Sequence, residues 1–442
     1  MNKKLVVLAV AGAFASPLIV QAQTANVTLY GRLNMDLEFV KGEQADGSNP
    51  TVNRVSSNSS RFGMRGTESL GGGLNAIFQI ESNVSGDTGN AASSSLASRE
   101  TFVGLQGSWG KVTLGKFLMP QDDIRFIFDN STTLGTSLLS DGAIWGQAQE
   151  SKSTGGFDAR TGNNIRYDSP NYMGFTAALQ YATRDSSGDT QNFISCTPAV
   201  GAPVGGVPTT TFLCPTLAAS AGNVGGADNG NHLSELRHAY VLGGNVIYNN
   251  GPIAVAASFE HNQKVRQYAS DAALPANPPG TCQPGSSNAC PFFANDTDWT
   301  IAGSYDFGTI MQGFGLKVGL GYERTKYDTP TGDLKRDYYG VAVTIPVGGG
   351  KFMLNYGHAT NGKGGASDAE PAVGQLRHGD ATSSTLWEVS YVYSLSPRTL
   401  LQTGYIKINN NDRASYSFHI NPYTIKVGGD PSALMFGIVH LF

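Results

Sequence analysis

Residues 27–39, with the sequence VTLYGRLNMDLEF, alternate apolar and polar side chains. A repeat of two residues places the apolar side chains on one face of a β-strand and the polar ones on the other. Residues 73–82, GLNAIFQIES, repeat this pattern, and Ile77 is the one exception. Both stretches therefore predict strands that separate an apolar medium from water.

The same repeat of two gives sixteen candidate strands along the chain. They begin near residues 27, 58, 73, 99, 110, 161, 173, 236, 252, 297, 314, 335, 350, 384, 399 and 433. The gaps between them alternate between short turns rich in Gly, Pro, Asn and Ser and long loops. The long loops span roughly residues 41–57, 83–98, 118–160, 184–235, 263–296, 327–334, 360–383 and 410–432. Turns on one rim and loops on the other predict an all-β fold, a transmembrane antiparallel β-barrel of sixteen strands.

The composition agrees with a barrel wall between lipid and water. Charged residues make up 14% of the chain, against about 25% in soluble domains. No run of 18 apolar residues occurs after residue 22, which excludes helical spans and leaves the closed barrel. A soluble all-β protein or a β-solenoid stays open as the alternative. Neither explains the segregated loop lengths, and both would carry more charge on their exposed faces.

Residues 1–22 have the pattern of a secretory signal peptide. Lys3 and Lys4 precede the apolar stretch LVVLAVAGAFA, and a small-residue cleavage site ends at Ala22. Cleavage there leaves residues 23–442 as a single barrel domain. A retained helical anchor is the alternative, although the stretch is shorter than the ~20 residues of a spanning helix. The mature chain has 28 basic and 34 acidic residues, a formal charge of −6 that gives no argument for nucleic-acid binding.

The chain has four cysteines, all in Gly/Pro/Ser-rich loop sequence: Cys196, Cys214, Cys282 and Cys290. In an exported chain they are candidates for two disulfides, and three pairings are open. We favour the local pairing of each cysteine with its neighbour in the sequence. No Cys-x-x-Cys or histidine pair accompanies them, so a metal site is not expected.

No pattern of catalytic residues stands out. The seven histidines are scattered, and neither H-E-x-x-H nor G-x-S-x-G occurs. We therefore expect neither an enzyme nor a cofactor, although a Ser/His hydrolase on the barrel exterior stays open.

Four stretches resemble the general porins of Gram-negative bacteria, and the beta-proteobacterial branch most of all. They are SSRFGMRGTESLGGG at 59–73, RETFVGLQGSWGKVTLGK at 99–116, NIRYDSP at 164–170 and GIVHLF at 437–442. The resemblance implies a homotrimeric, water-filled pore in the outer membrane for passive diffusion of ions and small hydrophilic solutes. It also implies that Phe442 resembles the signal that the barrel-insertion machinery reads. An ordinary residue of the aromatic girdle is the alternative for this phenylalanine.

The long loop 118–160 is the candidate for a constriction inside the pore. A barrel of about sixteen strands is too wide to be filled by its own side chains. In and just before this loop, seven apolar residues could pack against the wall: Phe117, Leu118, Ile124, Phe126, Ile127, Phe128 and Trp145. Its acids are Asp122, Asp123, Asp129, Asp141 and Glu150. The resemblance also assigns an inward-folded constriction loop to this place, and an outward loop with solvated acids is the alternative.

Basic residues should form the opposite side of the constriction. Within residues 61–65, Phe62 and Met64 have one parity and the two arginines the other. A lipid-facing arginine near the bilayer midplane costs ~2–4 kcal/mol, so both arginines should face water. The predicted basic wall comprises Arg32, Arg61, Arg65, Arg99, Lys116 and Arg166. Arg99 and Lys116 are placed there by the resemblance, because each lies near a strand end.

These residues predict a pore with loop acids facing wall bases. Such a transverse field orders water and aligns polar solutes. The alternative is a substrate-selective channel or a surface-binding protein that uses the long loops 184–235 and 263–296. The expected partners are outer-membrane lipid, two further copies of the chain in a homotrimer and the insertion machinery, but no nucleic acid.

Overall fold

The computed structural model describes residues 26–89, 96–128, 137–147, 150–152, 154–183, 197–204, 207–213, 239–268, 292–310 and 315–442. The predicted signal peptide, the four cysteines, Asp129 and most of the loops 184–235 and 263–296 lie outside these residues. Predictions about them therefore stay predictions.

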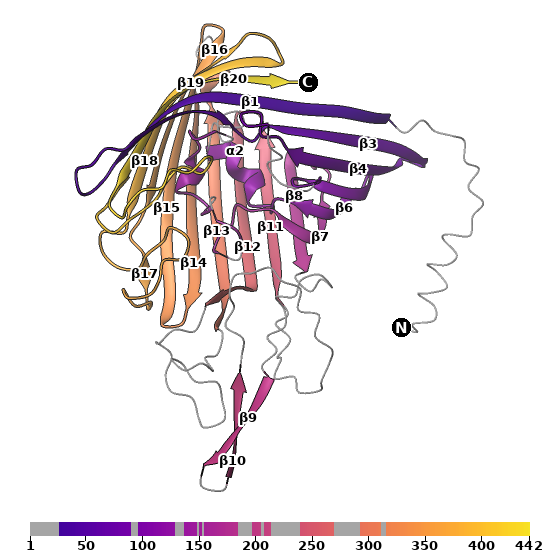
Figure 1. Ribbon diagram of the computed structural model, residues 1–442. Helices are drawn as coiled ribbons and strands as arrows, with labels where there is room; N and C mark the ends of the chain where they lie inside the picture. Colours follow the sequence, from indigo (N-terminus) through magenta and orange to yellow (C-terminus); the bar gives the residue numbers. More distant parts are fainter. Residues whose placement is uncertain are drawn as a thin grey trace.

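The strands form one closed antiparallel wall (Figure 1). They are β1 (Asn26–Glu43), β2 (Thr51–Ser57), β3 (Arg61–Gly71), β4 (Leu74–Asn83), β5 (Thr101–Gly107), β6 (Gly110–Phe117), β7 (Thr161–Asp168), β8 (Phe175–Thr183), β11 (Tyr240–Asn250), β12 (Ile253–Tyr268), β13 (Phe292–Asp306), β14 (Lys317–Thr329), β15 (Gly332–Val347), β16 (Gly350–Ala359), β17 (Lys363–Gly364), β18 (Ser384–Ser394), β19 (Thr399–Asn410) and β20 (Asp430–Leu441). β1 pairs with β3 and β2 on one side and with β20 on the other, which closes the barrel.

The barrel has the predicted sixteen strands. β2 and β3 both pair with β1 and form one barrel strand, which is interrupted at residues 58–60, where Ser59 has a φ of 51°. The two-residue β17 is an addition beside β15. With β2 and β3 counted once and β17 left out, the main sheet contains sixteen strands.

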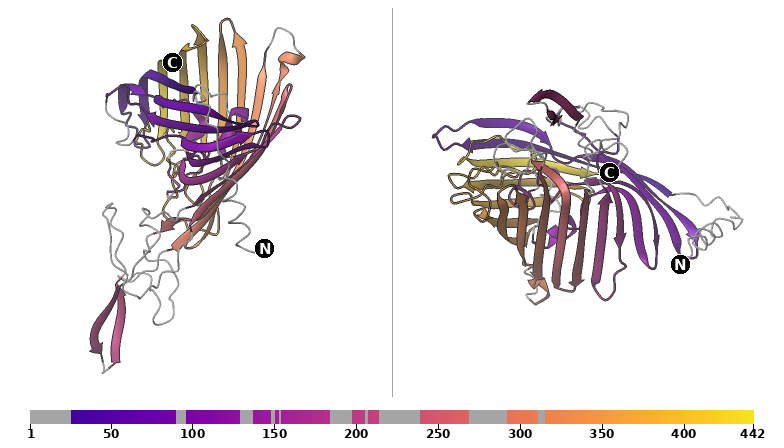
Figure 2. Two further views of the ribbon diagram at one scale, coloured as in Figure 1. Left: turned by 90° about the vertical axis from the view of Figure 1, so that its right-hand side faces the viewer. Right: turned by 90° about the horizontal axis from the view of Figure 1, so that it is seen from below.

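Short turns and long loops alternate around the barrel, as predicted. The main difference is the expected long loop 327–334, which shrinks to residues 330–331 because β14 and β15 extend into it. A separate hairpin, β9 (Thr197–Val204) and β10 (Val207–Leu213), lies within the long connection after β8. Figure 2 shows the barrel strands as one curved wall and this hairpin projecting away from it.

The two faces of the wall differ in polarity. On β1, Val27 and Leu29 are exposed on the outside, whereas Asn34, Asp36 and Glu38 are buried inside. A wall with an apolar outside and a polar inside is what a membrane barrel requires. Among the described residues, no helix is long and apolar enough to cross a membrane.

The loop after β6 folds into the barrel. It contains the short helices η1 (Asp122–Ile124), α2 (Arg125–Phe128) and η2 (Asp141–Ala143), and Figure 1 shows α2 inside the wall. Phe128 packs against Trp145, with ring centroids 5.4 Å apart, and against Tyr338 of β15 at 6.4 Å. The core of the molecule therefore lies between this loop and the inner wall.

Two glycines of β14 let the loop approach the wall closely. A Cβ atom on Gly319 would lie 2.2 Å from the carbonyl oxygen of Ile127. One on Gly321 would lie 2.6 Å from the ring of Phe128. Both distances are far below van der Waals contact, so α2 can only sit here because β14 has no side chains at these positions.

Buried ion pairs also hold the loop. Lys152 of the loop donates to Glu260 of β12 at 2.5 Å, and both side chains are buried. The backbone N–H of Gly146 donates to Glu323 at 2.8 Å, and Glu323 pairs with the fully buried Arg336 at 2.6 Å. Loss of one partner of such a pair leaves an uncompensated buried charge, so these contacts fix the position of the loop.

Candidate pore constriction

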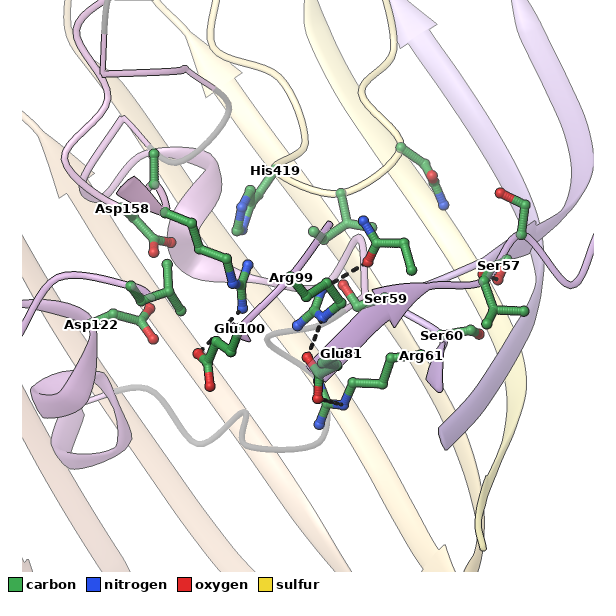
Figure 3. A pocket seen from close by; sticks show the side chains of 18 of the residues that line it. Ser57, Ser59, Ser60, Arg61, Glu81, Arg99, Glu100, Asp122, Asp158 and His419 are labelled. Atoms are coloured by element: carbon green, nitrogen blue, oxygen red, sulfur yellow. Dashed lines mark hydrogen bonds and ion pairs between the residues drawn. The ribbon is translucent and has the colours of Figure 1, made fainter. Parts of the chain in front are cut away.

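A cavity of about 650 Å³ lies inside the barrel where the loop leaves space (Figure 3). One side is the inner wall of β3 and β4, and the other is the loop 118–160. A third element is the loop 411–429 between β19 and β20, which contributes His419, Ile420 and Asn421. The polar lining on three sides marks this cavity as the candidate constriction of the pore.

On the wall side, one carboxylate is shared between two guanidinium groups. Arg99 Nε donates to Glu81 at 2.6 Å, and Arg61 lies 3.7 Å from the other oxygen of the same carboxylate. Tyr30 also donates to Glu81 at 3.0 Å, and Arg99 donates to Asn83 at 3.0 Å. Two positive charges against one negative charge leave an excess of positive charge on this wall.

On the loop side, Arg125 holds three carboxylates together. It lies 3.0 Å from Asp141, 3.4 Å from Asp158 and 4.0 Å from Asp122. Burial and repulsion by Asp158 raise the pKa of Asp122, although 25% of its side chain is exposed to the cavity. Burial also disfavours the ionised form of Asp158. The interactions with Arg125 and His419 outweigh this effect and lower the pKa of Asp158. Asp158 therefore ionises at a lower pH than Asp122.

The charges that line the cavity balance. Arg160 pairs with Glu100 at 3.7 Å, and burial beside Arg99 lowers the pKa of Arg160. The lining includes four arginines, Arg61, Arg99, Arg125 and Arg160, and four carboxylates, Glu81, Glu100, Asp122 and Asp158. His419 is the remaining ionisable residue of the lining, so its protonation would give the balanced lining a net positive charge.

The predicted basic residues occupy three kinds of position. Arg61 and Arg99 line the cavity, and Arg32 is buried on the inner face of β1. Arg65 lies on the inner side over the ring of Tyr30, 5.2 Å from its centroid. These four arginines share the lumen with Arg166, which lies away from the cavity.

Arg166 faces inward but lies away from the cavity. It pairs with Asp123 at 2.5 Å and with Asp168 at 2.7 Å, so its charge is offset by two carboxylates.

Lys116 departs from the prediction. Strand alternation places it on the same side of β6 as the exposed Leu114, opposite to the inward Phe117, and therefore on the outside.

The predicted acids of the loop are also dispersed. Asp122 lines the cavity, whereas Asp123 pairs with Arg166 and Asp141 is buried against Arg125. Glu150 lies beside Gly374 of another loop and outside the cavity lining. Asp129 is outside the described residues.

Several lining residues were not predicted from the sequence. Glu81 has the inward parity of its strand, so alternation could have found it. Arg125, Asp158 and Arg160 lie within or at the edge of the predicted loop, but their orientation depends on the loop conformation. His419 was missed because its loop was expected to project outward.

The loop 411–429 is the second long loop that folds inward. Tyr416 and Phe418 are fully buried, and Arg336 donates to the hydroxyl of Tyr416 at 3.4 Å. His419 Nδ1 lies 3.3 Å from the hydroxyl of Ser140 in the constriction loop. Contacts with both the wall and the other loop make it a fixed part of the constriction.

The lining offers no metal site. Within the described ranges, no group of three or more His, Cys, Asp or Glu residues could hold a metal ion. The four carboxylates of the lining each have an arginine within 4.0 Å. Opposite charges placed around the lining in this way can produce an electric field across a water-filled passage.

Comparison with known proteins gives a consistent result. The profile of the family described as Gram-negative porin matches residues 6–413. Outer membrane porin protein 32 of Delftia acidovorans is 26% identical over all of both chains. An outer membrane porin of Bordetella pertussis is 29% identical over 91% of this chain and 92% of its own.

Solved structures show the same fold. The anion-selective porin from Comamonas acidovorans superposes with a TM-score of 0.63 at 23% identity, covering 95% of this chain and 100% of its own. Outer-membrane OmpT of Vibrio cholerae superposes with a TM-score of 0.56 at 15% identity, covering 96% and 99%.

Proposed function

Because this chain belongs to the Gram-negative porins and forms an outer-membrane pore for passive diffusion, we propose that the cavity beside Arg61 is its constriction. Porins are channels and not enzymes, so the function lies in what the constriction lets through. The observation that carries the proposal is the position of Arg61 and Arg99 across the cavity from Asp122 and Asp158 (Figure 3). This separation of charge creates a transverse field that aligns dipolar solutes and disfavours apolar ones.

We propose further that the pore prefers small anions. The charges of the lining itself balance, but Arg65 adds positive charge to the lumen, whereas Arg32 is accompanied by Asp36 on the same inner face of β1. Glu81 is also shared by two arginines, so it offsets only one of them. The structural neighbour described as an anion-selective porin is consistent with this preference.

Solute size separates a general pore from a selective one. Proteoliposomes should swell in isotonic sugars of increasing size at rates that fall smoothly with size. Saturation by one solute would instead support a substrate-selective channel that uses the loops 184–235 and 263–296. The described residues around the cavity form ion pairs rather than a shaped sugar site, so the general pore is the proposal we favour.

We propose that three copies of the chain associate. The outer faces of β1, β3, β5 and β6 carry exposed apolar side chains, among them Val27, Leu29, Leu33, Phe62, Val103, Leu105 and Leu114. This surface of mainly aliphatic side chains suits a contact between copies in the membrane. An unheated sample should migrate on a denaturing gel at the mass of a trimer and shift to the monomer on heating; migration as a monomer without heating would contradict the proposal.

We propose that Phe442 serves as an insertion signal. It ends the strand that closes the barrel, its N–H donates to the carbonyl of Gly31 at 3.1 Å, and its ring packs over this glycine. Deletion of Phe442 should slow insertion into vesicles that contain the insertion machinery. An unchanged rate would leave it as a girdle residue.

A further inference from the structure

Tyr30 of β1 and Glu81 of β4 meet across the strand that lies between them. Tyr30 lies directly opposite Gly63 of β3, and Gly63 lies directly opposite Glu81. Neighbouring strands are about 4.8 Å apart, so two spacings, or about 10 Å, separate β1 from β4. The hydroxyl of Tyr30 nevertheless donates a hydrogen bond to Glu81 Oε2 at 3.0 Å. The two side chains therefore reach toward each other over the inner face of β3.

Gly63 leaves the room for this contact. A Cβ atom at this position would lie 2.6 Å from Cζ of Tyr30 and 2.7 Å from its hydroxyl oxygen, so any side chain here would displace the ring. Arg65, two residues further along β3, lies over the same ring, 5.2 Å from its centroid. The backbone of Gly63 and the cation–π contact with Arg65 together define the position of the ring.

The hydrogen bond from Tyr30 occupies one oxygen of the carboxylate that two arginines share. Glu81 Oε1 accepts from Arg99 Nε at 2.6 Å, whereas Arg61 lies 3.7 Å from Oε2, beyond hydrogen-bonding distance (Figure 3). The hydroxyl of Tyr30 therefore makes the shorter contact with Oε2. It fixes the direction in which the carboxylate faces Arg61.

The same hydrogen bond reduces the negative charge that Glu81 presents to the lumen. A hydroxyl proton carries a partial positive charge, and it points at Oε2 here. The part of the carboxylate charge that Tyr30 offsets does not act on Arg61 or Arg99. Tyr30 is not among the residues that line the cavity, so its effect on passing ions has to act through Glu81.

We propose that Tyr30 is a positioning residue that sets the ion preference of the pore through Glu81. This inference rests on the proposed function, in which the cavity beside Arg61 is the constriction. With the hydroxyl in place, Oε2 is held away from Arg61 and the wall keeps an excess of positive charge. Without the hydroxyl, the carboxylate turns Oε2 toward Arg61 and offsets more of its charge. Loss of the hydroxyl should therefore shift the pore toward cations.

The substitution Tyr30→Phe tests the hydroxyl and keeps the ring beneath Arg65. The ratio of chloride to potassium permeability, from zero-current potentials in a potassium chloride gradient, should fall up to about twofold. The effect is small because a partial charge acts less strongly than the unit charge of a carboxylate. In a barrel that already carries Glu81→Gln, the same substitution should leave the ratio unchanged. A tyrosine with only a structural role would not distinguish the two backgrounds.

Tyr322→Phe is the matched control. The hydroxyl of Tyr322 also donates to a carboxylate, that of Asp337 at 2.8 Å, but Tyr322 has the outward parity of the exposed Leu320 on β14. Its loss should leave the permeability ratio at the native value. Single channels of each variant in planar bilayers show that the barrel is closed and folded.

The failure of this inference differs from the failure of the proposed function. An unchanged ratio in the double variant Arg61→Gln and Arg99→Gln would contradict the constriction itself. If that variant shifts the ratio and Tyr30→Phe does not, the role of Tyr30 is wrong and the constriction stands. A rise of the ratio in Tyr30→Phe, or an equal fall with and without Glu81→Gln, would also overturn the role of Tyr30.

Discussion

Arg99 donates from Nε to a carboxylate oxygen of Glu81 at 2.6 Å, and this pair lies on the wall of the pore. The same carboxylate also has Arg61 within 3.7 Å. Glu81 therefore holds two arginines in position and offsets part of their charge. The selectivity of the constriction depends on this balance.

The substitution Glu81→Gln should increase the preference for anions. It removes a negative charge beside two arginines, and a unit charge about 4 Å away in water is worth ~1 kcal/mol. We expect the ratio of chloride to potassium permeability to rise up to about fivefold in zero-current potentials. Glu68→Gln, at an exposed position of β3 near the turn rim, is the control and should leave the ratio as it is. A fall in the ratio for Glu81→Gln would contradict the assigned role.

Acidification should also increase the preference for anions. A histidine changes its charge between pH 5 and 8, and protonation of His419 adds a positive charge to a balanced lining. The raised pKa of Asp122 means that this carboxylate takes up its proton at a higher pH than an ordinary aspartate, which removes a negative charge. Both changes act in the same direction.

Reversal potentials measured from pH 8 to pH 4 test this prediction. The change of the permeability ratio with pH should become smaller in His419→Gln and also in Asp122→Asn. A permeability ratio that does not vary with pH in the native pore would refute the account of this balance.

The close approach of the loop to β14 predicts that Gly319→Ala destabilises the protein. The new Cβ would meet the carbonyl oxygen of Ile127 at 2.2 Å, so α2 must move. Overpacking of this kind costs about 1–3 kcal/mol, and we expect a lower urea midpoint and a wider spread of single-channel conductances. Gly303→Ala is the matched control, because its nearest neighbour lies at 3.9 Å. Equal midpoints for the two variants would mean that the loop is not seated as described.

The buried pair of Arg336 and Glu323 predicts a large effect of Arg336→Gln. Both side chains are fully buried, and removal of one partner of such a pair costs about 3–5 kcal/mol. Arg324→Gln on the neighbouring strand removes an exposed arginine and should cost at most about 1 kcal/mol. The free energy of unfolding in urea compares the two. Similar small losses in both variants would show that the constriction loop does not depend on this pair.

The wall of the barrel could be predicted from the sequence because alternation is a local property. The pattern of residues 27–39 places each side chain inside or outside without knowledge of the rest of the chain. The sixteen strands and the alternation of turns and loops are confirmed in the structure. The gap 327–334 is shorter in the structure than predicted because β14 and β15 continue through its polar residues.

The constriction could be predicted only in outline. The acids of residues 118–160 suggested a charged loop, but the pairing of Arg125 with Asp141 and Asp158 depends on how this loop turns inside the barrel. Lys116 was misplaced because the prediction relied on resemblance near a strand end, where alternation gives the outward side. The inward path of the loop 411–429 rests on Tyr416 and Phe418, which loop length alone does not distinguish from residues of an outward loop.

The zero-current potential of the double variant Arg61→Gln and Arg99→Gln in a potassium chloride gradient tests whether the cavity beside these arginines is the constriction. Removal of both wall arginines leaves Glu81 facing the loop acids, so the ratio of chloride to potassium permeability should fall and the pore should favour cations. The double variant Arg324→Gln and Lys335→Gln removes the same charge from the outer face and should behave like the native pore. An unchanged ratio in the Arg61 and Arg99 variant would show that the cavity between this wall and the loop is not the constriction.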